Sequence, residues 1–390
     1  MSANQVKYPQ LRFAGFADDW EERKLGEVYN FQYGQFNNNP DNGGQYPIYG
    51  ANGIIGGYDE YNSENAIVIG HMGAYAGHVL WAEGKHFVTY NGTMGIADKS
   101  ILNSNFGYYL VVSVNVPKLT AGSGQPFVSY SDLNGIKILI PTIEEQQKIG
   151  SFFKQLDNTI TLHQRKLDLL KEQKKGYLQK MFPKNGEKVP ELRFAGFADD
   201  WEQRKLGKMG YTFTGLSGKT KEDFGHGNAK FVTYMNVFSS PVSNSEMVEN
   251  VEVDSKQHQV EYGDVFFTTS SETPQEVGMS SVWLETAENI YLNSFCFGYH
   301  PMVEFDPYYL AFMLRSPVIR KKFMLLAQGI SRYNISKNKV MEMLVPVPEI
   351  VEQQKIGAFF KQLDDTIVLH QRKLDLLKEQ KKGFLQNMFA

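Results

Sequence analysis

Apolar residues recur at alternating spacings of four and three along residues 146–182, with polar residues between them. This heptad period is typical of a long coiled-coil helix. At 1.5 Å rise per residue, such a helix would be a rod of roughly 50 Å. Residues 353–389 carry the same pattern in the same phase, so the sequence predicts two of these helices. The apolar seam consists of Ile149, Phe153, Leu156, Ile160, Leu167 and Leu170 in the first copy, and Ile356, Phe360, Leu363, Ile367, Leu374 and Leu377 in the second.

The two helical stretches are near-identical copies that begin 207 residues apart and differ at five of 37 positions. One rod cannot bury its seam alone, and its duplicate is the nearest partner. A core helix of an ordinary bundle is the alternative, but here the polar positions are repeated as well as the seam. We expect antiparallel pairing, because each helix adjoins a different globular segment. His163, Lys174, His370 and Lys381 interrupt the seam, where polar residues more often fix register than bind ligands.

A second repeat lies before each globular segment. Residues 9–26 return as residues 190–207 with two changes in 18. The aromatic residues Phe13, Phe16 and Trp20 of this leader favour docking against a helix end or a partner. The leaders are offset by 181 residues and the helices by 207, so the second intervening region is 26 residues longer than the first. The repeated leaders and long helices, here called the frame, therefore enclose two different regions.

The sequence predicts an α+β domain in each of the two intervening regions. Short β-branched runs between Gly and Asn predict strands, among them residues 77–84, 86–90 and 229–238. A helix follows at residues 106–114 in one region and from Asp306-Pro307 in the other. The predicted fold is α+β, with two pseudo-symmetric α+β domains separated by two long antiparallel coiled-coil helices. The predicted boundaries are a leader at 1–22, the first domain at 23–141, the first long helix at 142–183, a linker and repeated leader at 184–203, the second domain at 204–347 and the second long helix at 348–390.

Composition limits the class of protein. The 390 residues are 42% hydrophobic and 21% charged, and this length exceeds what one core usually holds. No apolar run approaches the roughly 20 residues of a membrane helix, and the first ten residues lack the apolar stretch of a secretory signal. Cys296 is the only cysteine, which excludes an intramolecular disulfide and a cysteine-based zinc site. We expect a cytoplasmic protein without a membrane partner.

The motifs that would indicate catalysis are incomplete. The segment Asp306-Pro307-Tyr308-Tyr309 is similar to the Asp-Pro-Pro-Tyr motif of amino-methyltransferases, but it lacks the second proline and fits a helix N-cap followed by proline. Phosphate-binding loops are absent, and the eight histidines have no metal-ligand spacing. Glu144 and Glu145 lie at the start of a long helix, where they favour its dipole. We expect no catalytic residue, metal or cofactor in this chain.

Loops rich in Gly, Asn, Ser and Arg remain as candidate binding sites. Asn, Gln and Arg form bidentate hydrogen bonds with base edges, and Lys holds phosphates. The net charge of −3 is no nucleic-acid signature, so positive charge must be local or supplied by a partner. A basic cluster near residues 315–339 is local, although a solvated helix face explains residues 320–322 equally well. The predicted DNA contacts are His71, Tyr75, Asn91, Thr93, Lys118, Ser123, Gln125, Thr269, Ser270, Arg320, Lys322, Arg332, Tyr333, Asn334 and Lys337.

The order of these repeats resembles one family over essentially the whole chain. Pro141 precedes the helix entry Glu-Gln-Gln-Lys-Ile at residues 145–149, and Pro348 precedes the same entry at residues 352–356. Together with the repeated leader and two variable regions, these motifs resemble the specificity subunit of a type I restriction-modification system. The variable regions are similar to its target recognition domains, so no base-contacting residue transfers from the family.

The resemblance implies a non-catalytic, DNA-binding subunit of a bacterial defence system. Each target recognition domain would read one half of a bipartite asymmetric target, and the helices would set the spacer. The implied partners are double-stranded DNA, two methyltransferase (M) subunits acting on adenine N6 with S-adenosylmethionine, and two restriction (R) subunits using ATP and Mg²⁺. Two other classes stay open from the residues alone. They are a self-contained DNA methyltransferase or nuclease, and a coiled-coil scaffold whose inserts bind protein or glycan.

Overall fold

The computed structural model describes residues 8–36, 41–120 and 126–389. The chain divides into two compact units, here called the first unit (residues 1–165 with 371–390) and the second unit (residues 166–370). Each unit combines one recognition region with part of both long helices, so the helices belong to both units along the chain. The predicted α+β architecture with two paired long helices is confirmed.

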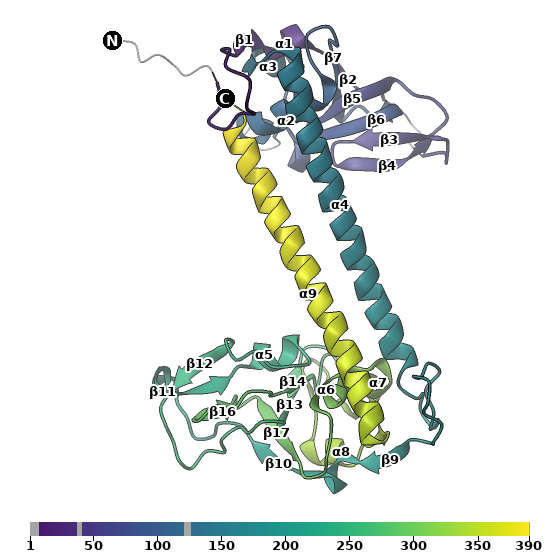
Figure 1. Ribbon diagram of the computed structural model, residues 1–390, viewed down its shortest axis with the longest axis vertical. Coiled ribbons are helices and arrows are strands. Elements are labelled where there is room, and N and C mark those ends of the chain that lie inside the picture. The colour runs from purple at the N-terminus through teal and green to yellow at the C-terminus, as the bar shows by residue number, and fades with distance from the viewer. Residues whose placement is uncertain (1–7, 37–40, 121–125, 390) are drawn as a thin grey trace. The chain divides into compact units, whose positions relative to one another are not determined.

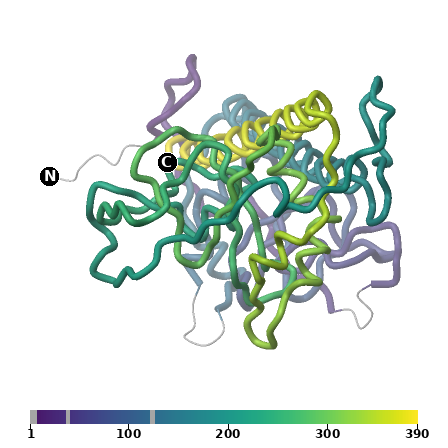
Figure 2. Tube along the Cα trace, turned by 90° about the horizontal axis from the view of Figure 1, so that it is seen from below, coloured from purple at the N-terminus to yellow at the C-terminus, as the bar shows by residue number. Residues whose placement is uncertain are grey.

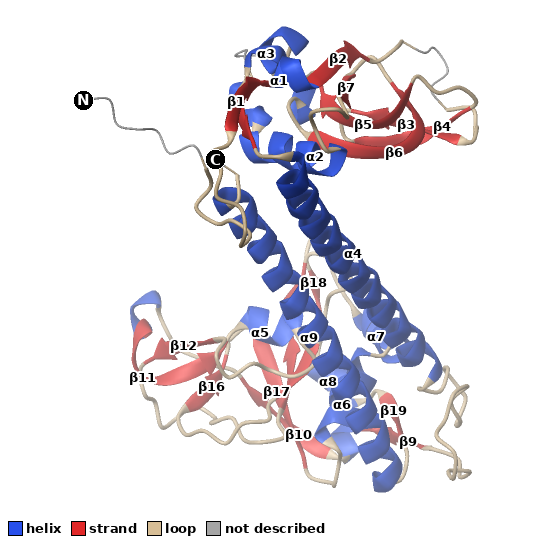
Figure 3. Ribbon diagram, turned by 45° about the horizontal axis from the view of Figure 1, so that its top comes forward, coloured by secondary structure: helices blue, strands red, loops and turns tan. Residues whose placement is uncertain are grey.

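The first unit contains a six-stranded sheet in the order β2-β7-β5-β6-β3-β4 and a separate pair, β1-β8. Short helices gather on the side of the unit opposite the large sheet (Figure 3). Its elements are β1 Glu21–Lys24, α1 Leu25–Val28, β2 Tyr29–Tyr33, β3 Tyr46–Gly50, β4 Gly53–Tyr58, β5 Ser63–Gly70, η1 Gly73–Tyr75, β6 Val79–Val88, β7 Gly92–Ala97, α2 Ser104–Val114, η2 Val116–Leu119, α3 Tyr130–Gly135, β8 Lys137–Ile140 and the start of α4 Ile143–Lys180.

The central strand β5 is apolar and buried from residue 66 to residue 70, as expected for a strand with neighbours on both edges. One expectation is corrected here. Residues 77–84 and 86–90 were predicted as two strands, but β6 runs through both of them. Gly84 adopts φ of 68° within β6, and the register shifts opposite it between Glu64 and Ala66. A bulge therefore absorbs the irregularity that the sequence pattern suggests is a turn.

The second unit has a four-stranded sheet (β10-β17-β13-β15), a three-stranded sheet (β12-β11-β16) and two strand pairs, β14-β18 and β19-β9. Its elements are β9 Glu202–Lys205, η3 Leu206–Lys208, β10 Gly210–Thr214, η4 Lys221–Asp223, β11 Phe224–Val232, α5 Tyr234–Ser239, β12 Val248–Val251, β13 Val265–Thr268, β14 Ser270–Ser271, β15 Ser280–Val282, β16 Ile290–Leu292, β17 Cys296–Pro301, α6 Pro307–Arg315, α7 Pro317–Leu326, β18 Tyr333–Asn334, α8 Lys337–Met341, β19 Leu344–Val347 and most of α9 Ile350–Asn387.

Side-chain caps start helices α5, α6 and α7 of the second unit. The Asp306 carboxylate accepts a 2.7 Å hydrogen bond from the Tyr309 backbone N–H, and Pro307 is the first residue of α6, as predicted. The prediction that residues 229–238 form one strand is wrong. The Thr233 side chain accepts from the Asn236 N–H and starts α5, so the apolar run changes from strand to helix at a capping residue.

A strand pair closes each recognition region where the chain enters and leaves it. β1 pairs antiparallel with β8, aligning Glu21 with Ile140. β9 pairs antiparallel with β19, aligning Glu202 with Val347 in the corresponding register. Entry and exit therefore lie side by side in both units, and each region is attached to the frame through one short two-stranded sheet.

Helices α4 and α9 pack antiparallel within each unit (Figure 1). In the first unit the rings of Phe152 and Phe384 lie 5.1 Å apart, and in the second unit those of Tyr177 and Phe359 lie 5.0 Å apart. α9 is one uninterrupted helix, drawn in yellow in Figure 2. The seam residues Ile149, Phe153, Leu167, Leu170, Ile356, Phe360, Leu374 and Leu377 are buried, and Leu156, Ile160, Leu363 and Ile367 are half-buried.

Lysines inside the heptad seam form ion pairs between the two helices. Lys381 Nζ lies 2.6 Å from an Asp157 carboxylate oxygen in the first unit. Lys174 Nζ lies 2.5 Å from an Asp364 carboxylate oxygen in the second. Lys381 is the counterpart of Lys174 in the helix repeat, and Asp364 is the counterpart of Asp157. The two ion pairs are therefore the same pair, with α4 and α9 exchanging the lysine and the aspartate. Each lysine also lies over an aromatic ring of its own recognition region, Tyr109 or Phe312, so the polar seam positions tie the helices to that region.

Candidate nucleic-acid interface

The leaders fix each recognition region to its helix through a buried ion pair. Arg12 donates two 2.7 Å hydrogen bonds to the Glu145 carboxylate, and Arg193 does the same to Glu352 at 2.7 and 2.8 Å. Both glutamates are fully buried. Such bidentate pairs are geometrically specific. Glu145 therefore holds the leader in addition to favouring the helix dipole.

A neighbouring glutamine connects the same helix start to the recognition region. The Gln146 side chain accepts from the Asn103 N–H at 2.8 Å and donates to the Pro141 carbonyl at 2.9 Å. Gln353 makes the equivalent contacts with Asp306 and Pro348. Asn103 and Asp306 cap α2 and α6. The repeated Glu-Gln entry is thus an anchoring motif, and it sets each recognition region against α4 or α9 in the same way.

In the second unit, two predicted loops meet in the ribbon β14–β18. Ser270 pairs with Asn334 and Ser271 with Tyr333, and the Ile335 N–H donates to the Thr269 carbonyl at 2.9 Å. A hollow of about 320 Å³ borders this ribbon, lined by Tyr234, Met235, Phe238, Ser270, Ser271, Glu272, Glu276, Phe295 and Arg332. The arrangement places polar and charged side chains around apolar and aromatic walls.

The first unit repeats this junction after β5. Met72 forms an antiparallel bridge with Phe127, and the Val128 N–H donates to the His71 carbonyl at 2.9 Å. The His71 N–H in turn donates to the Asn91 carbonyl at 2.8 Å, so three loops converge. The ring of Tyr33 lies 4.4 Å from that of His71. This junction is aromatic, whereas that of the second unit carries charges.

The structure brings some predicted first-unit residues together and separates others. His71 and Asn91 lie at the junction, and Tyr75 is exposed in η1 next to it. Lys118 is exposed in η2. Thr93 corrects the prediction, because its side chain is buried within β7 and points away from solvent. Ser123 and Gln125 lie outside the described residues.

In the second unit, most predicted residues gather along the ribbon. Thr269 donates its hydroxyl proton to the Phe295 carbonyl at 2.8 Å, and Ser270 is buried against the hollow. Arg332 and Asn334 are exposed, and Tyr333 is half-buried. Lys337 is the half-buried first residue of α8.

Two basic residues predicted to contact DNA are occupied inside the fold. Arg320 donates to the carbonyls of Gln275, Val277 and Gly278 at 2.6 to 2.9 Å. Lys322 donates to the Leu344 carbonyl at 2.6 Å, and burial lowers the pKa of Lys322. These bonds give both side chains partners inside the protein, so we do not retain either residue among the proposed DNA contacts.

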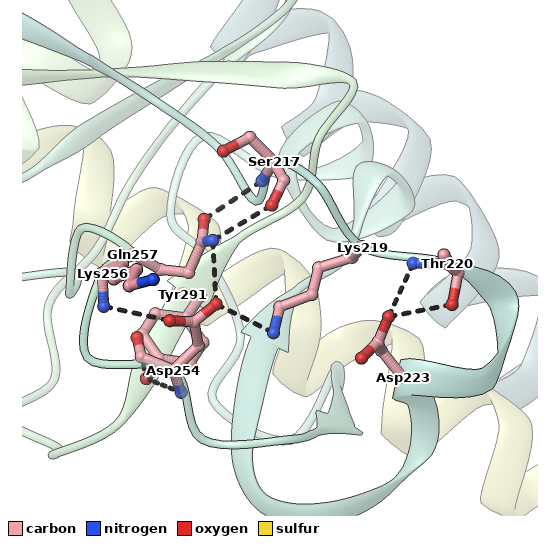
Figure 4. Close-up of polar contacts among 8 residues, drawn as sticks. All are labelled: Ser217, Lys219, Thr220, Asp223, Asp254, Lys256, Gln257 and Tyr291. Atoms are coloured by element: carbon pink, nitrogen blue, oxygen red, sulfur yellow. Dashed lines mark hydrogen bonds and ion pairs between the residues drawn. The ribbon is translucent and has the colours of Figure 1, made fainter.

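Another polar cluster of the second unit orders a loop (Figure 4). The Asp254 carboxylate accepts from Lys219 Nζ at 3.0 Å, from the Lys256 N–H at 3.0 Å and from Gln257 Nε2 at 3.1 Å. The hydrogen bond from Lys219, the largest of these effects, lowers the pKa of Asp254 to about 2. Because Asp254 and Lys219 satisfy each other, we interpret this cluster as the scaffold of residues 215–223 and not as a catalytic site.

Among the described residues, no group of histidine, cysteine, aspartate or glutamate side chains is arranged to hold a metal ion. Within the same part of the chain, none of the helices has the length and apolar character needed to cross a membrane.

Comparisons with known proteins point to one family. The chain is 26% identical to the EcoprrI specificity subunit of a type I restriction enzyme from Escherichia coli over 174 residues, covering 41% of this chain and 43% of that relative, which is less than half its length. It is 22% identical to the MjaVIII type I specificity subunit of Methanocaldococcus jannaschii over 416 aligned positions, covering 94% of this chain and 91% of the relative.

Solved structures share the fold. The S subunit of a type I restriction-modification system from M. genitalium matches with a TM-score of 0.65 at 16% identity, covering 98% of this chain and 99% of that one. A chain from a structure of type I system assembly and conformational transition matches with a TM-score of 0.54 at 16% identity, covering 94% and 96%. The family model described as "Type I restriction modification DNA specificity domain" matches residues 17–172 and 198–379. Since these two matches take in most of both halves, the chain belongs to the type I restriction-modification DNA specificity family.

Proposed function

We propose that the two recognition regions of this specificity subunit each bind one half of a split, asymmetric target in double-stranded DNA. The observation that carries the proposal is the contrast between a repeated frame and divergent ribbons. The Arg–Glu anchor, the glutamine contacts and the closing strand pair recur in both units. The paired residues differ, with Met72 and Phe127 in one unit and Ser270 and Asn334 at the corresponding positions in the other. Because the frame is the same and the ribbon residues differ, the two regions would bind different half-sites.

The residues proposed to contact DNA are those that the structure leaves accessible at the junctions. They are His71, Tyr75 and Asn91 in the first unit, and Thr269, Arg332, Tyr333 and Asn334 in the second, with Lys118 and Lys337 as candidates for phosphate contacts. The long helices are proposed to set the spacer between half-sites. At 1.5 Å per residue, a 38-residue helix is about 57 Å long, compared with about 34 Å for one turn of B-DNA.

Catalysis is proposed to reside in partners bound to the duplicated frame. Two M subunits with S-adenosylmethionine would methylate adenine N6 after flipping it out of the duplex, and two R subunits would use ATP and Mg²⁺. Exposed leucines support helix-mediated docking: Leu162 and Leu169 on α4 are repeated as Leu369 and Leu376 on α9, each at least half exposed. With chromosomal DNA as ligand, the proposed compartment is the cytoplasm.

Mapping of N6-methyladenine by long-read sequencing tests this function. The host genome is compared with and without this gene while the methyltransferase partner is kept. We expect a split asymmetric motif with a fixed spacer to disappear when the gene is deleted. An unchanged methylation pattern, or loss of a continuous motif, would contradict the proposal and favour a scaffold role.

A further inference from the structure

We propose that the second recognition region reads one G·C base pair in the major groove, with Arg332 contacting guanine and Glu272 contacting cytosine. The inference rests on the proposed function, because a base-pair contact requires that this region binds duplex DNA. Arg332 is predicted from the sequence as a DNA contact, but its partner base is not, and Glu272 is not among the predicted residues.

A narrow loop carries Arg332. Gln328 and Asn334 exchange both backbone hydrogen bonds, at 2.9 and 2.8 Å, and so close a loop over residues 329–333. Gly329 adopts φ of 143°, and a Cβ there would lie 2.0 Å from the Arg332 carbonyl oxygen. Only glycine fits this closure. Ile330 is 94% exposed within the loop, so the loop projects into solvent.

Together with residues 270–272, this loop forms a two-stranded element. Ser270 pairs with Asn334 and Ser271 with Tyr333, so Glu272 directly follows β14 and Arg332 directly precedes β18 at the same end of the ribbon. The major groove of B-DNA admits an α-helix or a two-stranded β-ribbon. The element therefore has the form needed to bring Glu272 and Arg332 to base edges.

The two side chains have free hydrogen-bonding groups of the required kind. Both are exposed, and within the described part of the chain neither forms a hydrogen bond or an ion pair. A guanidinium donates bidentately to guanine O6 and N7, and a carboxylate accepts from cytosine N4. Both also line the hollow whose walls include Tyr234, Phe238 and Phe295. Covering this hollow with DNA would exclude water, which strengthens polar contacts at its rim.

The first unit provides an internal contrast. Its bridge between Met72 and Phe127 corresponds to the pair Ser270–Asn334, because the next residues, Val128 and Ile335, donate to the carbonyls of His71 and Thr269. Two residues after this pair, the second unit carries Glu272 and the first unit carries Ala74, whose side chain has no hydrogen-bond acceptor. The carboxylate proposed to contact cytosine is therefore not repeated in the first unit.

Guanine analogues test the assignment directly. The assembled complex of the full chain with its methyltransferase partners is bound to a fluorescent duplex carrying the mapped target, at one fixed salt concentration. Each guanine is replaced in turn by 7-deazaguanine, which loses the N7 acceptor and keeps Watson–Crick pairing. The half-site of the second region is assigned by exchanging residues 204–347. At one guanine of this half-site we expect affinity to fall about 10-fold, as for loss of part of a bidentate contact.

Protein variants show whether Arg332 makes that contact. Arg332→Ala should weaken binding of the natural target and remove the further effect of 7-deazaguanine. Arg332→Lys keeps the charge without the planar fork, so it should retain more affinity than alanine while losing discrimination of that base pair. Lys221→Ala is the matched control, an exposed cation of the same unit, and should change binding to both duplexes equally.

The outcomes separate this inference from the proposed function. If 7-deazaguanine is tolerated throughout the second half-site, or still weakens binding by the Arg332→Ala complex, the assignment is overturned. A half-site without a G·C pair would overturn it as well. If the wild-type complex shows no sequence preference, the proposed function fails and this inference fails with it.

Discussion

At the scale of single residues, Arg320 shows how a structural cation can resemble a DNA contact in the sequence. Its guanidinium donates to the carbonyls of Gln275, Val277 and Gly278 and lies 5.0 Å from the Phe323 ring centroid. Burial lowers its pKa to about 10, so it stays protonated at neutral pH. We expect Arg320→Ala to reduce the free energy of unfolding by about 2–4 kcal/mol, because hydrogen bonds to a charged group are lost and buried carbonyls are left unpaired.

Urea unfolding followed by circular dichroism measures this effect. The neighbouring Lys321 is exposed, so Lys321→Ala is the control and should change stability by less than about 0.5 kcal/mol. If Arg320→Ala unfolds like the wild type but loses affinity for DNA, the arginine is a DNA contact after all.

The sequence predicts residue roles only where the deciding partner is nearby in the chain. Asp306 was predicted as a helix cap because its partner is the N–H of Tyr309, three residues later. The partners of Arg320 lie more than 40 residues away, and no local pattern announces them. Thr93 was misjudged because the Gly-rich turn before it suggested a loop, whereas pairing with both β2 and β5 buries it.

At the scale of elements, the ion pairs between α4 and α9 are the feature most open to experiment. Lys174 and Asp364 are about a quarter exposed and lie within the heptad seam, so their charge interaction is only partly screened. Lys174→Glu should place two carboxylates together and lower the free energy of unfolding by about 1–2 kcal/mol. Adding Asp364→Lys should restore most of the loss.

Thermal unfolding of the wild type, the two single variants and the double variant gives the free energies of unfolding for a double-mutant cycle. Lys171→Glu on the exposed surface of the same helix is the control, because it changes the net charge by the same amount. If the double variant is no more stable than the less stable single one, the pair does not fix the helix register.

Helices and strands could be predicted from the sequence where the residues that determine them lie close together in the chain. The apolar residues of 146–182 and 353–389 repeat with the heptad spacing of a coiled coil. This spacing alone predicts both long helices and their pairing. The ribbon β14–β18 joins residues about 60 positions apart and contains only two residues in each strand. Nothing in such short segments specifies their partner, and only the fold shows that Glu272 and Arg332 line the same hollow.

At the scale of the whole molecule, the duplication makes the recognition regions exchangeable. The pairs Asp157–Lys381 and Asp364–Lys174 consist of equivalent residues with the two helix copies exchanged. Both regions are also closed by strand pairs in the same register. We predict that a chain carrying residues 21–140 in place of residues 202–347 folds and directs methylation to a symmetric split target.

The expected target follows from our proposal that two identical regions would bind DNA as a symmetric pair. Two copies of one region related by a two-fold axis read inverted repeats, because the symmetry of a DNA site mirrors that of the protein. Mapping of N6-methyladenine in cells that carry the exchanged chain and its partner should reveal two inverted copies of the half-site read by the first region. The reciprocal chain, with residues 202–347 in both positions, is the matched control and should yield the other half-site twice. A direct repeat would contradict the two-fold relation, and retention of the natural asymmetric motif would show that bases are read outside the exchanged regions.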